Sequence, residues 1–397
     1  MSTRVAVVVQ RYGLEVQGGA EAQARHVAEA LAESMHVEVI TTCALDYATW
    51  ADHYRAGAQD VNGVRVLRFP VAAPRDAAGF ERATRAAYAA PHDEALGLAW
   101  MRAQGPDAPG LTAHLAERGR DYDAVVLVTY LYATTALTIG SVADRALLIP
   151  ELHDEPPLRL SVFDRVFAAA RLVLFNTPEE RALGARRFGV DDARARVVGL
   201  GVDPPPPTDP ERLRRAHGIA RPYALCVGRL DPSKGTDALV ADHARYRAAS
   251  PEGLDLVLAG SGELALPEHP WLHRLGVVSE QEKHDALAGA AVVVLPSPYE
   301  SLSIVQLEAW SHGRPTLANA ASPVLVGQSR RCGGGLWYAD ADEYAVMLDY
   351  LARTPVLADA IGRQAHRAAG EAHSWDRVRR QWRDAVAEVA AGRAPAA

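Results

Sequence analysis

The sequence predicts an α/β protein with two Rossmann-like βαβ domains that face a central cleft. Two observations predict this fold class: short apolar runs alternate with helical stretches in both halves of the chain, and a proline-rich interruption separates the two series. Short β-branched runs between helices are typical of a parallel sheet that is covered on both faces. With 397 residues, the chain is also long enough for two domains of similar size.

The first series begins with the β-branched run 5–9, which predicts a buried strand. Glycines follow in a loop at 13–19, and the Ala-, Glu- and Arg-rich stretch 20–34 predicts the first helix. Further strands are expected at 36–42, 64–69, 124–129, 146–149 and 172–175. Because helical stretches alternate with these runs, we expect the strands to be parallel.

The alternation stops at 199–210, where four consecutive prolines predict a stiff linker. A second series follows, with strands expected at 223–227, 254–259, 275–278, 291–295 and 316–318. We therefore predict a first domain over 1–203 and a second domain over 204–373. A final helical stretch in 374–397 is expected to pack back on the first domain.

The composition argues against several classes of protein. The formal net charge is −7, whereas a general nucleic-acid binder would be basic. Cys43, Cys226 and Cys332 lie far apart without a CxxC pair, which argues against a disulfide framework and favours a reducing cytosol. Arg11 follows the run 5–9 too closely for a signal peptide, and no apolar stretch is long enough to span a bilayer. We expect a soluble, cytoplasmic protein that binds no nucleic acid.

A basic loop, Gly228-Arg229 to Lys234-Gly235, follows the first strand of the second series. Ligands bind outside the carboxyl ends of strands in α/β sheets, and this loop suits a phosphate group. Of the 42 basic residues, just two are lysines, Lys234 and Lys283. A chain that otherwise uses arginine has kept a compact ammonium here, which favours a specific role over a solvated basic turn.

An acidic pair, Glu300 and Glu308, brackets the start of a helix after the strand 291–295. With a rise of about 1.5 Å per residue, the two carboxylates would stand roughly 7–8 Å apart along the axis. The backbone N–H groups of Leu302, Ser303 and Ile304 would point out of the helix N-terminus and make an anion site. A diphosphate fits between such carboxylates, with a hydroxyl-rich sugar at each end. The alternative is a helix-terminal acid beside an unrelated surface acid.

Together these pieces resemble the family 4 retaining glycosyltransferases of the group 1 type, which have the GT-B fold. The resemblance covers essentially the whole chain, and the matching pieces are Gly18-Gly19-Ala20-Glu21, Leu152-His153-Asp154, Gly228-Arg229, Lys234-Gly235, Glu300-x7-Glu308 and Gly313-Arg314-Pro315. It implies transfer of a hexose from a nucleoside diphosphate sugar to a hydroxyl of a saccharide or glycolipid acceptor, with no cofactor. The first domain would bind the acceptor and the second domain the donor.

The resemblance also implies catalytic roles. Arg229 and Lys234 would neutralise the departing diphosphate, in place of a divalent cation. Glu300 is similar to the acid that holds the donor sugar, and Glu308 to the acid that holds the ribose hydroxyls. His153 resembles the histidine near the reacting sugar, although a lone histidine is more often structural.

Backbone groups complete the expected binding site. The Gly18-Gly19 loop looks like a close backbone approach that a side chain would obstruct. Gly228 and the amides of residues 302–304 would face the diphosphate, and backbone groups around Val278 would meet the base. The family often has glycine where this chain has Ser303, and the region 328–335 has no counterpart in the family pattern.

Three further patterns are interpreted as structural. Asp121-Tyr122-Asp123 resembles the DxD of metal-dependent glycosyltransferases, but it precedes the strand 124–129 and is typical of a turn. Gly260-Ser261-Gly262 imitates a dinucleotide fingerprint, but prolines interrupt the helix that the fingerprint requires. His92 and His153 each precede an aspartate without a helical histidine partner, so we predict no metal site.

Two other functions stay open: a catalytically silent nucleotide-sugar-binding protein, and another enzyme of this fold such as a sugar-nucleotide epimerase. The segment 72–104 is also open to two interpretations, a surface helical excursion or an acceptor-binding lid. It carries Arg75, Arg82 and Arg85, which suggest a peripheral contact with the inner face of a membrane.

Overall fold

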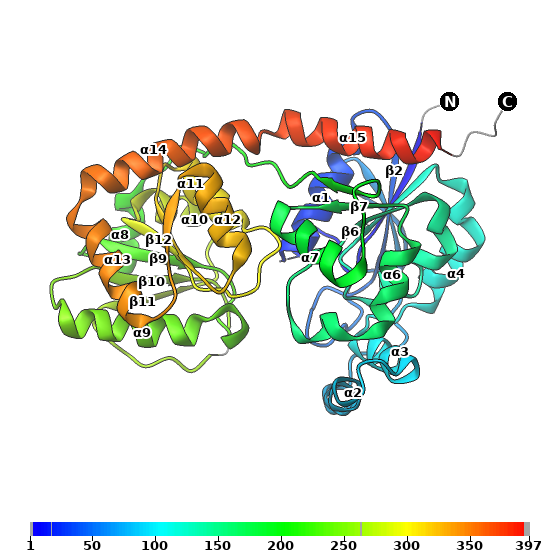
Figure 1. The fold of residues 1–397 in the computed structure, drawn as a ribbon, viewed down its shortest axis with the longest axis horizontal. Coiled ribbons are helices and arrows are strands. Elements are labelled where there is room, and N and C mark those ends of the chain that lie inside the picture. Colours follow the sequence, from blue (N-terminus) through cyan, green and yellow to red (C-terminus); the bar gives the residue numbers. More distant parts are fainter. Residues whose placement is uncertain (1–2, 17, 263, 393–397) are drawn as a thin grey trace. The chain divides into compact units, whose positions relative to one another are not determined.

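The structure is a computed structural model that describes residues 3–16, 18–262 and 264–392. It divides into two compact units: unit 1 comprises Met1–Gly199 and Val378–Ala397, and unit 2 comprises Leu200–Arg377. Each unit is a sheet covered by helices (Figure 1). The division lies close to the expected boundary at 203/204. Within the described ranges, no helix is both long and apolar enough to cross a membrane.

Unit 1 is built on a sheet in the order β3-β4-β2-β1-β5-β6-β7-β8. Its strands are β1 (Arg4–Val8), β2 (His36–Thr42), β3 (Gly57–Val61), β4 (Val64–Phe69), β5 (Ala124–Val128), β6 (Ala146–Ile149), β7 (Leu172–Phe175) and β8 (Ala195–Val197). The strands pair in parallel except for the edge pair β3–β4, which is antiparallel. β5 and β6 are buried at every residue, as expected for strands covered on both faces.

Helices flank this sheet and connect its strands. They are α1 (Gly19–Ala32), α2 (Ala77–Ala89), α3 (Glu94–Gln104), α4 (Pro109–Arg118), α5 (Ala133–Ala136), α6 (Asp164–Ala169) and α7 (Pro178–Phe188), with 3-10 turns η1 (Gly119–Asp121), η2 (Ile139–Arg145), η3 (Pro156–Arg159) and η4 (Ser161–Phe163). The segment 72–104 forms α2 and α3, and Asp76 and Asp93 cap the two helices. α2 lies on the surface, and Ala87 is its one buried residue.

The last element that the structure describes is the long helix α15 (Trp375–Ala391), which belongs to unit 1 from Val378 onward. Its buried side chains recur at helical spacing, as in an amphipathic helix that packs on a core: Val378, Trp382, Ala385, Val386 and Val389. Ion pairs accompany this packing, since Arg379 and Arg383 lie 3.0 and 3.2 Å from the Glu33 carboxylate.

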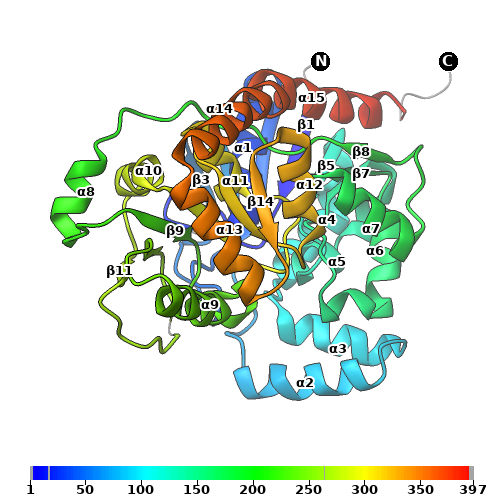
Figure 2. The ribbon, with the colours of Figure 1, turned by 60° about the vertical axis from the view of Figure 1, so that its left-hand side comes forward.

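Unit 2 is built on an all-parallel sheet in the order β11-β10-β9-β12-β13-β14. Its strands are β9 (Tyr223–Val227), β10 (Asp255–Ala259), β11 (Leu272–Gly276), β12 (Val292–Leu295), β13 (Thr316–Asn319) and β14 (Gly335–Tyr338). Its helices are α8 (Pro210–His217), η5 (Pro232–Lys234), α9 (Thr236–Ala249), α10 (Glu280–Gly289), α11 (Ile304–Ser311), α12 (Pro323–Cys332), α13 (Ala341–Arg353) and α14 (Pro355–Ala372). The core has two layers: α9 and α13 pack on one face of the sheet, and α8, α10, α11 and α12 pack on the other (Figure 2).

The structure corrects one expected strand and adds others. The strand expected at 275–278 is wrong: β11 ends at Gly276, which has a φ of +70°, and Val277 beyond it is 63% exposed. The antiparallel strand β3 escaped prediction because its side chains alternate between exposed and half-buried. β8 has three residues, too few for a pattern. Residues 198–209 form no helix or strand, as expected for a proline-rich linker.

His243, on α9, is fully buried, and both of its ring nitrogens form hydrogen bonds. Nε2 lies 3.0 Å from the Leu254 carbonyl oxygen and must donate to it, so the Tyr344 hydroxyl donates to Nδ1 at 2.8 Å. Burial lowers the pKa of this imidazole to about 4. An unfolded histidine titrates near its ordinary value of about 6.5. Between these two values the unfolded state binds the additional proton, so stability falls as the pH drops through this window.

We expect His243→Gln to reduce the acid sensitivity of the fold. Glutamine does not titrate in this range but keeps a donor and an acceptor. In the wild type, His243 should account for about 2 kcal/mol of the stability lost between pH 7.5 and pH 5. Urea unfolding of both proteins at the two pH values measures this loss. An equal loss in the variant would contradict the prediction.

Candidate functional site

In unit 2 the order of the sheet changes direction between β9 and β12, because β10 follows on one side and β13 on the other. Ligands bind outside the carboxyl ends of strands at such a switch point. The loop after β9 carries Arg229 and Lys234, and the loop after β12 carries Glu300. Lys234 Nζ lies 2.8 Å from Glu300 Oε1. The structure thus joins two of the predicted catalytic residues across the switch point.

Local backbone geometry places Lys234. The Asp231 Oδ1 atom accepts a hydrogen bond from Lys234 N at 3.1 Å, which caps the turn η5. The chain then turns at Gly235, which has a φ of +72°. A Cβ atom there would lie 2.6 Å from the Pro296 carbonyl oxygen, so glycine is required on two grounds. The loops after β9 and β12 therefore touch through their backbones next to the lysine.

Gly228 and Arg229 stand at the start of the same loop. Gly228 has a φ of +142°, and a Cβ atom on Gly260 would lie 1.8 Å from the Gly228 carbonyl oxygen. Gly260 and Gly262 are therefore required where the loop after β10 passes close to the backbone of the loop after β9, and the next element that the structure describes is the strand β11. Arg229 Nη1 lies 3.6 Å from Asp231 Oδ2, and its side chain is 56% exposed. More than half of the side chain is thus exposed at this edge of the sheet.

The start of α11 departs in part from the expected anion site. Ser303 N donates to Gln328 Oε1 at 3.2 Å, and the Ser303 hydroxyl caps the helix by accepting from Gln306 N. The Ser303 amide therefore does not face a ligand. Among the described residues, no hydrogen bond is found for the amides of Leu302 and Ile304. These two N–H groups remain as donors for an anion.

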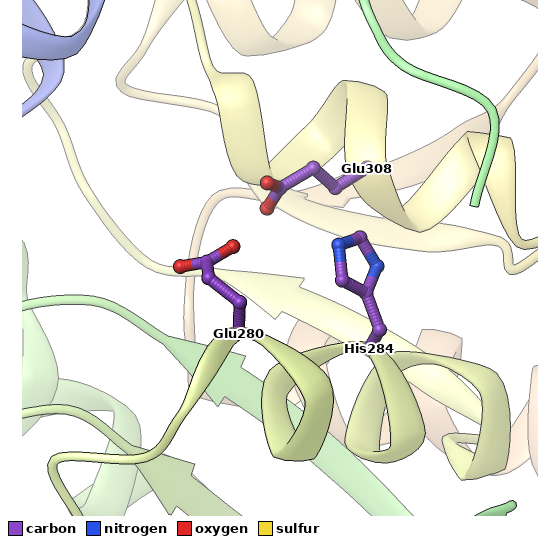
Figure 3. A group of neighbouring side chains, drawn as sticks. All are labelled: Glu280, His284 and Glu308. Carbon is purple, nitrogen blue, oxygen red and sulfur yellow. The ribbon is translucent and has the colours of Figure 1, made fainter. Parts of the chain in front are cut away.

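Glu308 lies on α11 and contacts the other lysine of the chain. Figure 3 shows the carboxylates of Glu280 and Glu308 turned toward each other, with His284 beside them. Ligand-type atoms of these three residues lie within 4.8 Å of one another, as around a metal ion. However, Lys283 Nζ lies 2.7 Å from Glu280 Oε2 and 2.8 Å from Glu308 Oε1. An ammonium already bridges the two carboxylates, so this cluster gives no support for a metal site.

Val278 lies in the short loop between β11 and α10, at the same sheet edge as the basic loop. Ser279 follows it and caps α10 in a capping box with Glu282. The loop is therefore held in place on its C-terminal side. Contacts from the backbone of this loop to a base stay a prediction.

In unit 1 the two predicted glycines have different environments. Gly18 has a φ of +148°, and a Cβ atom there would lie 2.0 Å from Glu21 Oε2. Glu21 is buried, and its Oε1 atom accepts hydrogen bonds from Arg11 and Gln10. The carboxylate of Glu21 therefore leaves no room for a side chain at position 18, which explains why this residue is glycine. At Gly19 a Cβ atom would meet nothing within 4 Å, so this residue borders open space.

His153 follows β6 at the carboxyl edge of the sheet in unit 1. Its Nδ1 atom lies 3.2 Å from Glu155 Oε1, and the side chain is 27% exposed. The Tyr130 hydroxyl donates to the same Glu155 oxygen at 3.3 Å. The carboxylate of buried Glu180 accepts a hydrogen bond from Leu152 N at 2.6 Å, which anchors the loop that carries His153. The ring thus lies beside Glu155 and is partly accessible.

Arg75, Arg82 and Arg85 of the segment 72–104 have different environments. Arg75 turns inward, donating to the Gln104 carbonyl oxygen at 2.5 Å, and its guanidinium lies 4.9 Å from the centre of the Trp50 ring. Arg82 and Arg85 each pair with an acid of the same segment. Arg75 is therefore turned inward, whereas Arg82 and Arg85 stay exposed beside acidic side chains.

The DxD-like pattern is structural, as expected. Asp123 Oδ2 accepts from Arg4 N at 2.9 Å, and Asp121 pairs with Arg118 at 2.5 Å. Both contacts lie before β5, at the amino end of the strand.

Two contacts of the site were missed by reasoning from the sequence. They are the hydrogen bond from Ser303 N to Gln328 and the ion pair of Lys283 with Glu308. Only the rarity of lysine marked Lys283 in advance, and Gln328 was marked only as the first residue of the region 328–335, which has no counterpart in the family pattern.

A family model described as glycosyl transferases group 1 matches residues 221–353, which include the basic loop and both glutamates. This stretch is a glycosyl transferases group 1 domain. The chain is 30% identical over 278 residues to a D-inositol 3-phosphate glycosyltransferase of Kribbella flavida, which covers 64% of each chain. It is also 30% identical over 218 residues to an MMP alpha-(1->4)-mannosyltransferase of Mycolicibacterium hassiacum, covering 51% of this chain and 52% of that one. The chain thus matches less than two thirds of the length of these curated relatives.

Solved structures confirm the predicted fold class. A sucrose-phosphate synthase from Thermosynechococcus elongatus superposes with a TM-score of 0.71 at 18% identity, covering 98% of this chain and all of that one. The Anabaena protein HepE in complex with UDP-glucose also gives 0.71, at 16% identity and over 97% and 99% of the two chains. The chain, with a largely parallel sheet in unit 1 and an all-parallel sheet in unit 2, therefore has the GT-B fold.

Proposed function

We propose that the chain is a retaining, metal-independent hexosyltransferase that moves a hexose from a nucleoside diphosphate sugar to a hydroxyl of a saccharide or glycolipid acceptor. One observation carries the proposal most strongly: the two lysines of the chain hold the two glutamates of the expected donor site, Lys234 on Glu300 and Lys283 on Glu308. The group 1 domain in this region, the names of the relatives and the UDP-glucose complex of HepE support it.

The diphosphate of the donor would lie at the switch point of unit 2. The free amides of Leu302 and Ile304 and the cations Arg229 and Lys234 surround the place where it would bind. As the bond to the sugar breaks, negative charge grows on the leaving diphosphate, and positioned cations stabilise it. Lys234 would exchange its contact with Glu300 for this charge, which frees the carboxylate to accept hydrogen bonds from sugar hydroxyls.

Unit 1 would bind the acceptor. At the carboxyl edge of its sheet, His153 lies beside Glu155 and is partly exposed. Gly19 borders open space in the same unit. We assign the acceptor hydroxyl to this edge of unit 1. No membrane contact is assigned to α2, because an acidic side chain lies beside each of its exposed arginines, Arg82 and Arg85.

Binding and turnover of sugar nucleotides test the proposal. A matching ligand raises the melting temperature by mass action, so UDP, GDP and ADP sugars should be screened by thermal shift. The donor found in this way should then release its nucleoside diphosphate when acceptors are added. Binding without release would favour the catalytically silent protein, and interconversion of the sugar nucleotide would favour an epimerase.

Activity is expected to survive an excess of EDTA. Two cations stand beside the diphosphate position, and the ammonium of Lys283 already bridges the carboxylates of the metal-like cluster found among the described residues, Glu280, His284 and Glu308. Nucleoside diphosphate release should be compared with and without EDTA at equal ionic strength. Complete loss that Mn²⁺ restores would contradict metal independence and direct attention to Glu280, His284 and Glu308.

A further inference from the structure

Lys283 is placed between two carboxylates of unequal burial. Its ammonium contacts Glu308 on α11 and Glu280 on its own helix, α10. The side chains of Lys283 and Glu308 are each 16% exposed, whereas Glu280 is 82% exposed. The inner pair is therefore the one shielded from water, where a charge pair is stronger and more directional than at the surface.

The inner pair is stable as an ion pair. Burial by itself disfavours the charged ammonium, but the carboxylates of Glu308 and Glu280 outweigh it and raise the pKa of Lys283. Contacts between the two helices support the geometry, since His284 Nδ1 lies 2.8 Å from His312 Nε2, just beyond α11. Lys283 and Glu308 are thus presented to each other by two helices that are in direct contact.

The pair leaves half of the Glu308 carboxylate unused. Lys283 Nζ binds Oε1, and among the described residues Oε2 has no hydrogen-bond partner. An ionised carboxylate has about four acceptor positions, so binding one oxygen to a fixed ammonium sets the direction of the other. A carboxylate with one free, oriented oxygen is suited to accept hydrogen bonds from vicinal hydroxyls.

We propose that Lys283 is a positioning residue that orients Glu308 toward the ribose hydroxyls of the nucleotide, and so makes the site prefer ribonucleotides to 2′-deoxyribonucleotides. This inference rests on the proposed function, in which Glu308 faces the ribose. Lys283 does not touch the reacting atoms. Its contribution is to restrict the carboxylate to one orientation, which lowers the entropic cost of each hydrogen bond to the hydroxyls.

Titration calorimetry with UDP and 2′-deoxy-UDP, and with the corresponding GDP and ADP pairs, measures the preference without turnover. The wild type should bind its preferred ribonucleotide about tenfold more tightly than the deoxy form, the effect of one hydrogen bond to a charged group. In Lys283→Met the ribonucleotide should bind more weakly, and the ratio should fall to about twofold. Lys283→Arg should keep part of the ratio, because it retains the charge.

Glu280→Gln is the matched control, because it removes the exposed partner of the same ammonium and leaves Glu308 paired. It should keep the wild-type ratio. Melting temperatures of all variants, measured without ligand, separate a loss of fold from a loss of preference. A wild-type ratio in folded Lys283→Met would overturn this inference alone. A wild type that binds both forms equally, or binds neither, would overturn the ribose contact of the proposed function as well.

Discussion

Lys234→Ala is expected to lower kcat by about 10²-fold or more, the size of effect seen when a donor to a developing anion is removed. The ammonium lies at the switch point of the donor unit, 2.8 Å from Glu300, and its side chain is 34% exposed. It is therefore accessible to a diphosphate. Steady-state release of nucleoside diphosphate, with the donor saturating, measures the change.

Lys234→Arg should restore only part of this activity. A guanidinium carries the charge but has a planar, forked geometry and a different reach from an ammonium. Arg363, exposed on α14, offers a matched control, because Arg363→Ala removes one positive charge from the same unit away from the site. Full turnover in Lys234→Ala would remove the assignment of the diphosphate to this loop, whatever the effect on donor affinity.

The second large effect expected is on stability. Trp382→Ala should lower the free energy of unfolding of unit 1 by about 3–5 kcal/mol, as for other buried tryptophans. Trp382 is 1% exposed in the middle of the apolar face of α15, the helix that returns to unit 1. Truncation leaves a cavity that rigid neighbours fill only in part.

Urea unfolding followed by circular dichroism measures this effect. The chain has two units, so the curves should be fitted for two transitions rather than one. Asp384→Ala tests an exposed position on the same helix and should change stability by no more than about 0.5 kcal/mol. A loss below about 1 kcal/mol in Trp382→Ala would mean that this part of α15 contributes little to the unit.

The buried strands were predictable because their sequence signal is local. The β-branched runs of β1 and β5 are recognisable without knowledge of their neighbours, since both faces of a central parallel strand must be apolar. The edge strand β3 lacks that requirement and was missed. The strand expected at 275–278 was displaced because the apolar residue Val277 lies beyond the glycine that ends β11.

The sequence by itself determined the two α/β units, the basic loop with Lys234 and the spacing of Glu300 and Glu308. These features depend on residue type and on separation along one segment of chain. Only the tertiary structure decided that Lys283 pairs with Glu308 and that Gln328 Oε1 accepts a hydrogen bond from Ser303 N. Each of these contacts joins two different helices or the loops before them. Such residues are brought together by the packing of helices on a sheet, which cannot be read from their spacing along the chain.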